Sequence, residues 1–159
     1  MEISDLLVLF GPLILGMSSG LLISKSKIPP VKSKYNPPPI VFSIVWPILY
    51  MILGYSSYKI NSIAKSKQTP EDDKDKIYEN NEAKWAITIF YIHLAGLIIW
   101  WPLFVYFPNK PLALGSLLIL AFSAIYIARL FYGLDRTSGL IMTPYIMWLF
   151  IASFLTANT

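Results

Sequence analysis

Long apolar stretches, separated by short polar segments, dominate the sequence. Five stretches contain no Lys, Arg, Asp or Glu: residues 6–24, 35–58, 85–109, 111–128 and 137–159. A helix needs about 20 consecutive apolar residues to cross the roughly 30 Å hydrocarbon core of a bilayer. The apolar runs are continuous and show no two-residue alternation, which argues against a β-barrel. The pattern predicts five transmembrane helices, at about 6–23, 39–58, 85–106, 112–133 and 138–157.

These helices predict an all-α fold, an integral, multi-pass membrane bundle that forms a single domain over residues 1–159. Two longer connections join the helices. The first, residues 24–38, is rich in proline, and we expect it to act as a lid. The second, residues 59–84, holds six lysines, six acidic residues and Pro70. Mixed charge of this kind is typical of a solvated segment, so we expect a linker here, with helical ends as an open alternative.

Composition narrows the function. Of the 159 residues 55% are hydrophobic and only 14% are charged, against about 25% charged in a typical soluble domain, which argues against a soluble enzyme. The sequence has no cysteine and one histidine, so we expect no disulfide and no metal centre. The net charge of +4 matches four lysines between Lys25 and Lys34, too local for a nucleic-acid surface. The expected surroundings are a lipid bilayer.

Three of the predicted helices carry aromatic side chains at helical spacing on one face. The faces comprise Phe42, Trp46 and Tyr50 in the second helix, His93, Leu97, Trp100 and Phe104 in the third, and Tyr145, Trp148, Ala152 and Leu155 in the fifth. Trp and Tyr commonly form belts at membrane interfaces, but Trp46, Trp100 and Trp148 lie several residues inside their spans. Two interpretations stay open: helix packing, which the pattern alone favours, or an apolar pocket for a flat ligand, anchored by hydroxyl and indole N–H groups.

Single residues inside the predicted helices raise further alternatives. His93 is either an axial haem ligand or, as the lack of a partner motif favours, a histidine bonded to a neighbouring helix. Prolines lie within four predicted helices and tend to kink them, which opens space in a bundle: Pro12, Pro47, Pro102 and Pro144. The Gly16-x-x-x-Gly20 motif permits close helix contact, within one chain or between two.

Two segments resemble the TspO/MBR family, the translocator proteins or tryptophan-rich sensory proteins. The run from Asn36 to Tyr58 is similar to the family's W-x-P-P, V-W-x-x-L-Y and G-Y-x-S-Y patterns. Pro144-Tyr145-x-x-Trp148-x-x-x-Ala152 is similar to its P-Y-x-x-W-x-x-x-A pattern. Trp100, Pro102 and Phe104 match more loosely. The likeness spans most of residues 30–158.

The resemblance implies a five-helix membrane protein that binds a hydrophobic ligand among its helices. Members of the family bind porphyrins and haem, cholesterol in animals, and benzodiazepine-type ligands, and some bacterial members promote light-dependent breakdown of protoporphyrin. The resemblance implies that the pocket is lined by Trp46, Tyr50, Trp100, Tyr145 and Trp148, with Ala152 on its wall, Lys32 as the loop lysine, and Pro37 and Pro38 as the closing turn. Phe42 and His93 join this set through their helix faces. A homodimer is implied as well.

We therefore expect a membrane receptor or sensor that binds a tetrapyrrole, protoporphyrin or haem, between the second, third and fifth helices. No cofactor is required. Two alternatives stay open: an enzyme-like photodegradation of porphyrin in which Trp46 and Trp148 donate electrons, and a small transporter of tetrapyrroles or lipids. This sequence departs from the family at Tyr35, where the family has tryptophan, at Leu97, where it has asparagine, and at His93, where glutamine is common.

Overall fold

The computed structural model describes residues 3–24, 37–66, 74–106 and 109–158, with the backbone alone for residues 19–24, 39 and 101–106. All regular structure in these ranges is helical: α1 (Ile3–Ser24), α2 (Pro39–Ala64), α3 (Lys74–Tyr106), α4 (Lys110–Leu134), α5 (Arg136–Leu140) and α6 (Thr143–Ala157). Most of the expected lid, residues 25–36 with Lys32, lies outside the described residues, as do the side chain of Phe104 and residues 67–73 of the expected linker.

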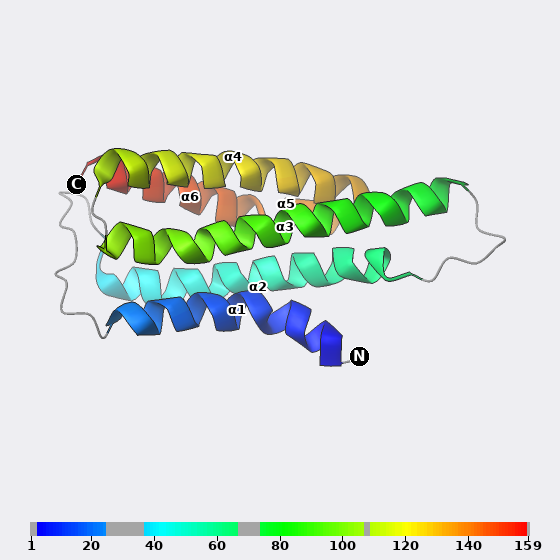
Figure 1. Ribbon diagram of the computed structural model, residues 1–159, viewed down its shortest axis with the longest axis horizontal. Helices are drawn as coiled ribbons and strands as arrows, with labels where there is room; N and C mark the ends of the chain where they lie inside the picture. Colours follow the sequence, from blue (N-terminus) through cyan, green and yellow to red (C-terminus); the bar gives the residue numbers. More distant parts are fainter. Residues whose placement is uncertain (1–2, 25–36, 67–73, 107–108, 159) are drawn as a thin grey trace.

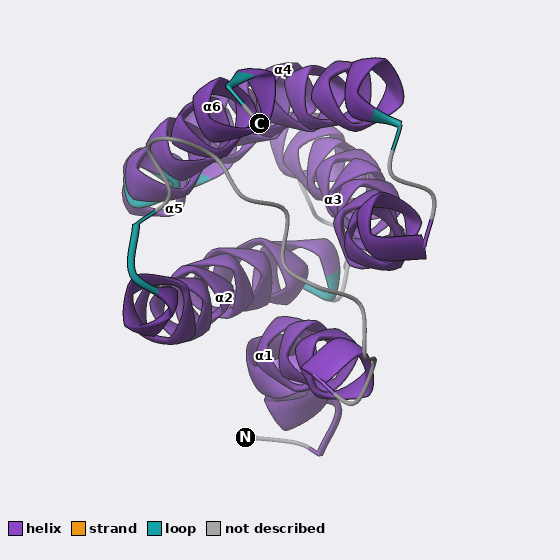
Figure 2. Cartoon of the chain, turned by 90° about the vertical axis from the view of Figure 1, so that its left-hand side faces the viewer, coloured by secondary structure: helices purple, strands orange, loops and turns teal. Residues whose placement is uncertain are grey.

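The helices form an elongated bundle (Figure 1). Seen from one end, α1 lies at one edge, α2 and α3 lie beside each other, and α4 and α6 cover the opposite side (Figure 2). Four described segments are long and apolar enough to cross a membrane, at Ile40–Ala64, Lys74–Trp100, Lys110–Leu134 and Arg136–Ala157, and α1 adds a shorter apolar helix. The prediction of an all-α membrane bundle of five helices is confirmed.

The fifth span consists of two helices, because Pro144 interrupts it. Proline has no N–H to donate to the carbonyl four residues back, and its ring clashes with that carbonyl. Pro144 therefore lies in the first turn of α6, where the missing donor costs little. The hydroxyl of Thr143 donates to the Leu140 carbonyl at 2.7 Å. Pro144 thus begins a helix, where the sequence predicted a kink inside one.

The described parts of the expected linker, residues 59–66 and 74–84, form mainly the end of α2 and the start of α3. Helix α3 begins at Lys74, and its residues from Lys74 to Glu79 are exposed. The next residue, Asn80, is buried, and its amide nitrogen donates to the carbonyls of Ile63, Ala64 and Ser66 at 3.0–3.2 Å. These carbonyls belong to the last turn of α2 and the residues just after it, where a helix leaves carbonyls without intrahelical partners. The Ile63 carbonyl also accepts from the backbone N–H of Ser66 at 3.1 Å. Asn80 therefore ties the start of α3 to the end of α2.

Two glycines allow α1 to pack closely against α2. A Cβ atom at Gly16 would overlap the ring of Tyr50, and one at Gly54 would overlap the backbone carbonyl oxygen of Leu9. The first half of the Gly16-x-x-x-Gly20 motif therefore serves a contact within the chain; Gly20 is described by its backbone alone. This contact holds Tyr50 in place at the edge of the aromatic side chains described next.

Candidate functional site

Four aromatic side chains from α2 and α6 form a connected group, here called the aromatic cluster: Phe42, Trp46, Tyr50 and Trp148. Trp46 stacks on Tyr50 with ring centroids 5.4 Å apart and an interplanar angle of 26°. Trp148 meets the rings of Phe42 and Trp46 edge to face, with centroids 5.7 and 6.4 Å apart. Edge-to-face and offset-stacked pairs are the geometries that aromatic rings favour. The spacing of these residues on their helix faces predicted that they share a side, and the structure brings them together.

The aromatic cluster bridges α2 and α6. The backbones of α2 and α6 approach each other at only a few positions, so large rings span the distance between them. Trp148 is 8% exposed, and its indole N–H has no hydrogen-bond partner among the described residues. A buried donor without an acceptor costs about 1–3 kcal/mol. The cluster therefore combines broad apolar surfaces with one unsatisfied donor.

Beside this cluster lie His93 on α3 and Tyr145 on α6, here called the histidine–tyrosine pair. The Tyr145 hydroxyl and His93 Nε2 are 2.7 Å apart, and Nδ1 lies 2.7 Å from the hydroxyl oxygen of Ser123 on α4. Ser123 donates its own proton to the Leu120 carbonyl at 2.9 Å, so its oxygen accepts from Nδ1–H. Nε2 then accepts from the tyrosine hydroxyl. His93 is thus a neutral histidine with both ring nitrogens engaged.

The remaining residues expected at the site lie around these two groups. Trp100 is buried, and its indole N–H donates to the Ala113 carbonyl of α4 at 3.3 Å, which directs the ring nitrogen to the α3–α4 contact. Ala152 is half-buried and packs against the core. Pro38 is the residue just before α2, and Pro37 is half-buried beside it.

Sequence reasoning missed Ser123, which joins the site through α4. The signal was present: Ser123 is a polar residue inside the charge-free run 111–128, and a polar side chain at that depth needs a partner. Nothing in a single sequence indicated that this partner is His93, because the two residues lie on different helices. The family resemblance implied pocket residues in the second, third and fifth spans, and none in α4.

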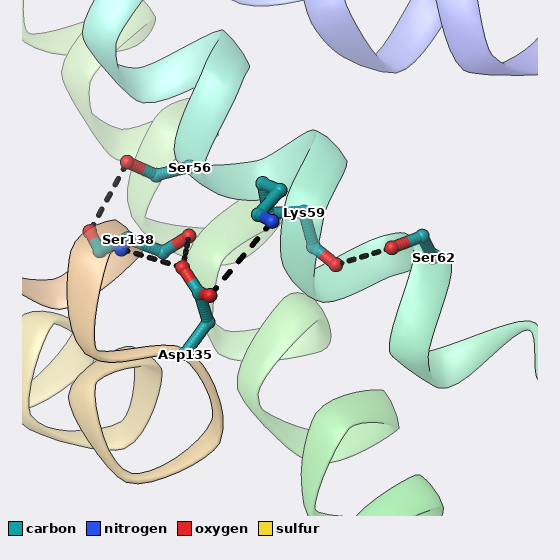
Figure 3. Close-up of polar contacts among 5 residues, drawn as sticks. All are labelled: Ser56, Lys59, Ser62, Asp135 and Ser138. Atoms are coloured by element: carbon teal, nitrogen blue, oxygen red, sulfur yellow. Dashed lines mark hydrogen bonds and ion pairs between the residues drawn. The ribbon is translucent and has the colours of Figure 1, made fainter.

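A second interhelical group, here called the polar cluster, lies toward the other end of α2: Ser56, Lys59, Asp135 and Ser138 (Figure 3). Asp135 precedes α5, and one of its carboxylate oxygens accepts from the backbone N–H and the hydroxyl of Ser138 at 2.7 and 2.6 Å. The other oxygen lies 3.9 Å from Nζ of Lys59. The buried Ser56 donates to the Ser138 carbonyl at 3.2 Å. These contacts join α2 to the turn between α4 and α5.

Hydrogen bonding sets the charge state of the polar cluster. The hydroxyl of Ser138 is the main cause that lowers the pKa of Asp135 below its ordinary value. Burial opposes it, and the backbone N–H of Ser138 and the Lys59 ammonium add smaller lowering effects. The carboxylate therefore stays ionised at neutral pH. An ionised Asp135 serves both as the cap of α5 and as the ion-pair partner of Lys59.

The comparisons with known proteins agree with this architecture. The TspO/MBR family model matches residues 8–159. A translocator protein homolog from Schizosaccharomyces pombe is 27% identical over 122 residues, which cover 77% of this chain and 68% of the relative. Protein CrtK from Rhodobacter capsulatus is 27% identical over 76% of this chain and 68% of its own length. The tryptophan-rich protein TspO of Chlorobaculum tepidum is 25% identical over 79% and 71%, respectively. With a match over nearly its whole length and spans to cross a bilayer several times, the chain is a multi-pass integral membrane protein that belongs to the TspO/MBR family.

Proposed function

We propose that the chain is a membrane receptor or sensor that binds a flat hydrophobic ligand, a tetrapyrrole such as protoporphyrin or haem, at the aromatic cluster. One observation carries the proposal: the indole N–H of Trp148 is buried among aromatic rings and has no acceptor within the described residues. Binding sites for flat ligands combine apolar walls with a few polar groups that fix orientation. The aromatic cluster offers this combination of surfaces.

The ligand's polar edge supplies the missing acceptor. A tetrapyrrole such as protoporphyrin carries carboxylate side chains at the margin of a large apolar plane, so it offers both kinds of contact. Its plane packs against the rings of Trp46 and Phe42, and a carboxylate oxygen at its edge accepts from the indole N–H of Trp148. Because α2 and α6 have few close backbone contacts, separating them to admit a ligand disrupts mainly ring contacts.

The engagement of His93 bears on which tetrapyrrole binds. Both of its ring nitrogens have partners, so ligation of a haem iron through Nε2 would first require Tyr145 to give up its hydrogen bond. Recognition at the aromatic cluster rests on the organic macrocycle and not on the metal. We therefore expect metal-free protoporphyrin and haem to bind with similar affinity.

The test is a titration of the detergent-purified protein with protoporphyrin, followed by tryptophan fluorescence quenching. We compare Trp46→Phe and Trp148→Phe with Trp85→Phe, a matched control because Trp85 is exposed on α3, away from the cluster. Saturable quenching that weakens in the first two variants and persists in Trp85→Phe supports the proposal. Quenching that does not saturate, or that is equal in all the variants, indicates partitioning into detergent and contradicts it.

A second candidate function is light-dependent breakdown of the bound porphyrin. The edge-to-face contact of Trp46 and Trp148 favours it, because two adjacent indoles can share a positive charge after one of them donates an electron. Illumination with and without oxygen, followed by absorption spectra of the products, tests this function. A porphyrin spectrum that remains unchanged in light would exclude it and leave the binding proposal intact.

A further inference from the structure

We propose that the histidine–tyrosine pair is a redox site, in which one-electron oxidation of Tyr145 is coupled to transfer of its phenolic proton to His93. The proposal goes beyond ligand binding, and it rests on the proposed function only for its natural oxidant, a photoexcited tetrapyrrole. It assigns a chemical role to two residues that neither the aromatic cluster nor the polar cluster uses.

The first step of the argument is the acidity of an oxidised phenol. A tyrosine that loses an electron becomes a strong acid, and it stays oxidised only when a base is already in contact with the hydroxyl. Tyr145 is 0% exposed and His93 is 4% exposed, so bulk water does not serve as this base. His93 Nε2, at 2.7 Å, is within direct proton-transfer distance.

The second step is the state of the histidine. Because Ser123 fixes the tautomer with the proton on Nδ1, the lone pair of Nε2 faces the tyrosine hydroxyl. The neighbouring charge-free runs, residues 85–109, 111–128 and 137–159, contain no carboxylate and no lysine that would compete for the proton. His93 is thus the one side-chain base in these stretches of α3, α4 and α6.

The third step is a source of the positive charge. Tyr145 and Trp148 are three residues apart on α6 and so share a helix face, and Trp148 contacts Trp46 at the aromatic cluster. A photoexcited tetrapyrrole that takes an electron from Trp148 becomes a radical anion and leaves an indole radical cation. Tyr145 then gives one electron to Trp148 and its phenolic proton to His93. The products are a neutral tryptophan, a neutral tyrosyl radical and a protonated histidine, so charge and atoms balance.

The consequence is protection of Trp148. Reduction by Tyr145 restores the indole before it reacts irreversibly with oxygen, and it keeps the electron on the ligand for longer. A chain without the proton acceptor makes the same transfer more slowly, because a positioned acid–base group contributes about 10²-fold or more to a proton-transfer rate.

The experiment is electron paramagnetic resonance of illuminated, rapidly frozen protein in detergent, in two arms. One arm uses visible light with protoporphyrin; the other uses ultraviolet light on the ligand-free protein, which ionises tryptophan directly. Tyr145→Phe removes the hydroxyl. His93→Gln keeps a hydrogen-bond acceptor but provides no base. Tyr126→Phe, an exposed tyrosine on α4, is the matched control.

We expect a tyrosyl radical in the wild type and in Tyr126→Phe, a tryptophan radical alone in Tyr145→Phe, and a yield of tyrosyl radical lowered about tenfold or more in His93→Gln. Mass spectrometry after prolonged light should find oxidised Trp148 earlier in both pair variants. A tyrosyl radical that appears only in the ultraviolet arm upholds the redox site and contradicts the tetrapyrrole. An undiminished tyrosyl signal in Tyr145→Phe or His93→Gln, or none in the wild type under ultraviolet light, overturns the redox site whether or not porphyrin binds.

Discussion

Helix α2 meets the carboxyl-terminal part of the chain in two different ways. Toward its end, Ser56 bonds to Ser138 of α5 and Lys59 pairs with Asp135, which caps α5, so both polar side chains have partners. Nearer its start, Phe42 and Trp46 meet Trp148 of α6 through their rings, and the indole N–H of Trp148 has no partner in the part of the chain that the structure describes.

The two kinds of contact suit different roles, the polar cluster stability and the aromatic cluster ligand binding. Hydrogen bonds fix geometry and lose energy steeply when they are stretched, so the polar cluster holds the helices in one arrangement. Ring contacts are weaker individually and less directional, so a ligand of similar shape can replace them. We infer that the polar cluster end of α2 is the fixed end and that the aromatic cluster end is the one that opens for a ligand.

The largest expected effect comes from a glycine beside the polar cluster. A Cβ atom at Gly139 would lie 2.5–2.6 Å from the backbone N, Cα and Cβ atoms of Tyr132, and helix backbone cannot move aside. Gly139→Ala should therefore destabilise the protein by about 3 kcal/mol, through overpacking. At the size of this chain that loss lowers the midpoint of thermal unfolding by about 10 °C.

The matched control is Gly115→Ala in α4, where a Cβ atom meets nothing within 4 Å. Alanine favours a helix over glycine by about 1 kcal/mol, so this variant should melt at the same temperature as the wild type or higher. If the two variants melted alike, close packing of α5 against α4 would not be what holds the fixed end.

The next effect comes from Asp135, the cap of α5. Asp135→Ala removes the acceptor for the Ser138 N–H and hydroxyl, and loss of such a cap costs about 1–2 kcal/mol. Because folding lowers the pKa of this carboxyl, its contribution is complete above the unfolded value of about 3.9 and disappears as pH falls through the folded value.

Thermal unfolding of the wild type and Asp135→Ala between pH 7 and pH 3 measures this. The difference between them should be constant down to about pH 5 and shrink below about pH 4. A difference that grows on acidification would mean that the carboxyl is protonated in the folded protein. Protoporphyrin affinity should be the same in both proteins at neutral pH.

Trp148→Phe should show the opposite behaviour. Phenylalanine keeps a ring in the aromatic cluster and removes a donor for which the described ranges of the chain offer no partner, so the free energy of unfolding should change by about 1 kcal/mol or less. The lost hydrogen bond to the ligand should raise the protoporphyrin dissociation constant by about fivefold, the equivalent of about 1 kcal/mol. Unfolding in detergent and fluorescence titration of one preparation measure both. A variant that unfolds early yet binds normally would reverse our assignment of the two ends.

The two ends also differ in how far the sequence predicts them. Charge-free runs predicted the spans, because a bilayer excludes charge, and helical spacing predicted that Phe42, Trp46 and Trp148 lie on inward faces. The polar cluster was not predicted, because it joins residues that are far apart in the sequence, such as Ser56 and Ser138, 82 positions apart. Likewise the hydrogen bond between His93 and Tyr145 joins residues 52 positions apart, and helical spacing within one segment does not predict contacts between segments so far apart in the sequence.

The smallest expected effect on stability comes from Lys59. It tests whether an ion pair or a hydrogen bond stabilises the fixed end. Its Nζ lies 3.9 Å from the Asp135 carboxylate and its side chain is 41% exposed, and pairs of this kind contribute about 0.5 kcal/mol or less. Lys59→Met should therefore lower stability only slightly, and the difference should vanish at high salt. Ser56→Ala, which removes a buried hydrogen bond to Ser138 in the same cluster, should cost about 1 kcal/mol whatever the salt concentration. If Lys59→Met cost more than Ser56→Ala, the ion pair and not the hydrogen bond from Ser56 would be the main link between α2 and α5, and the fixed end would weaken with ionic strength.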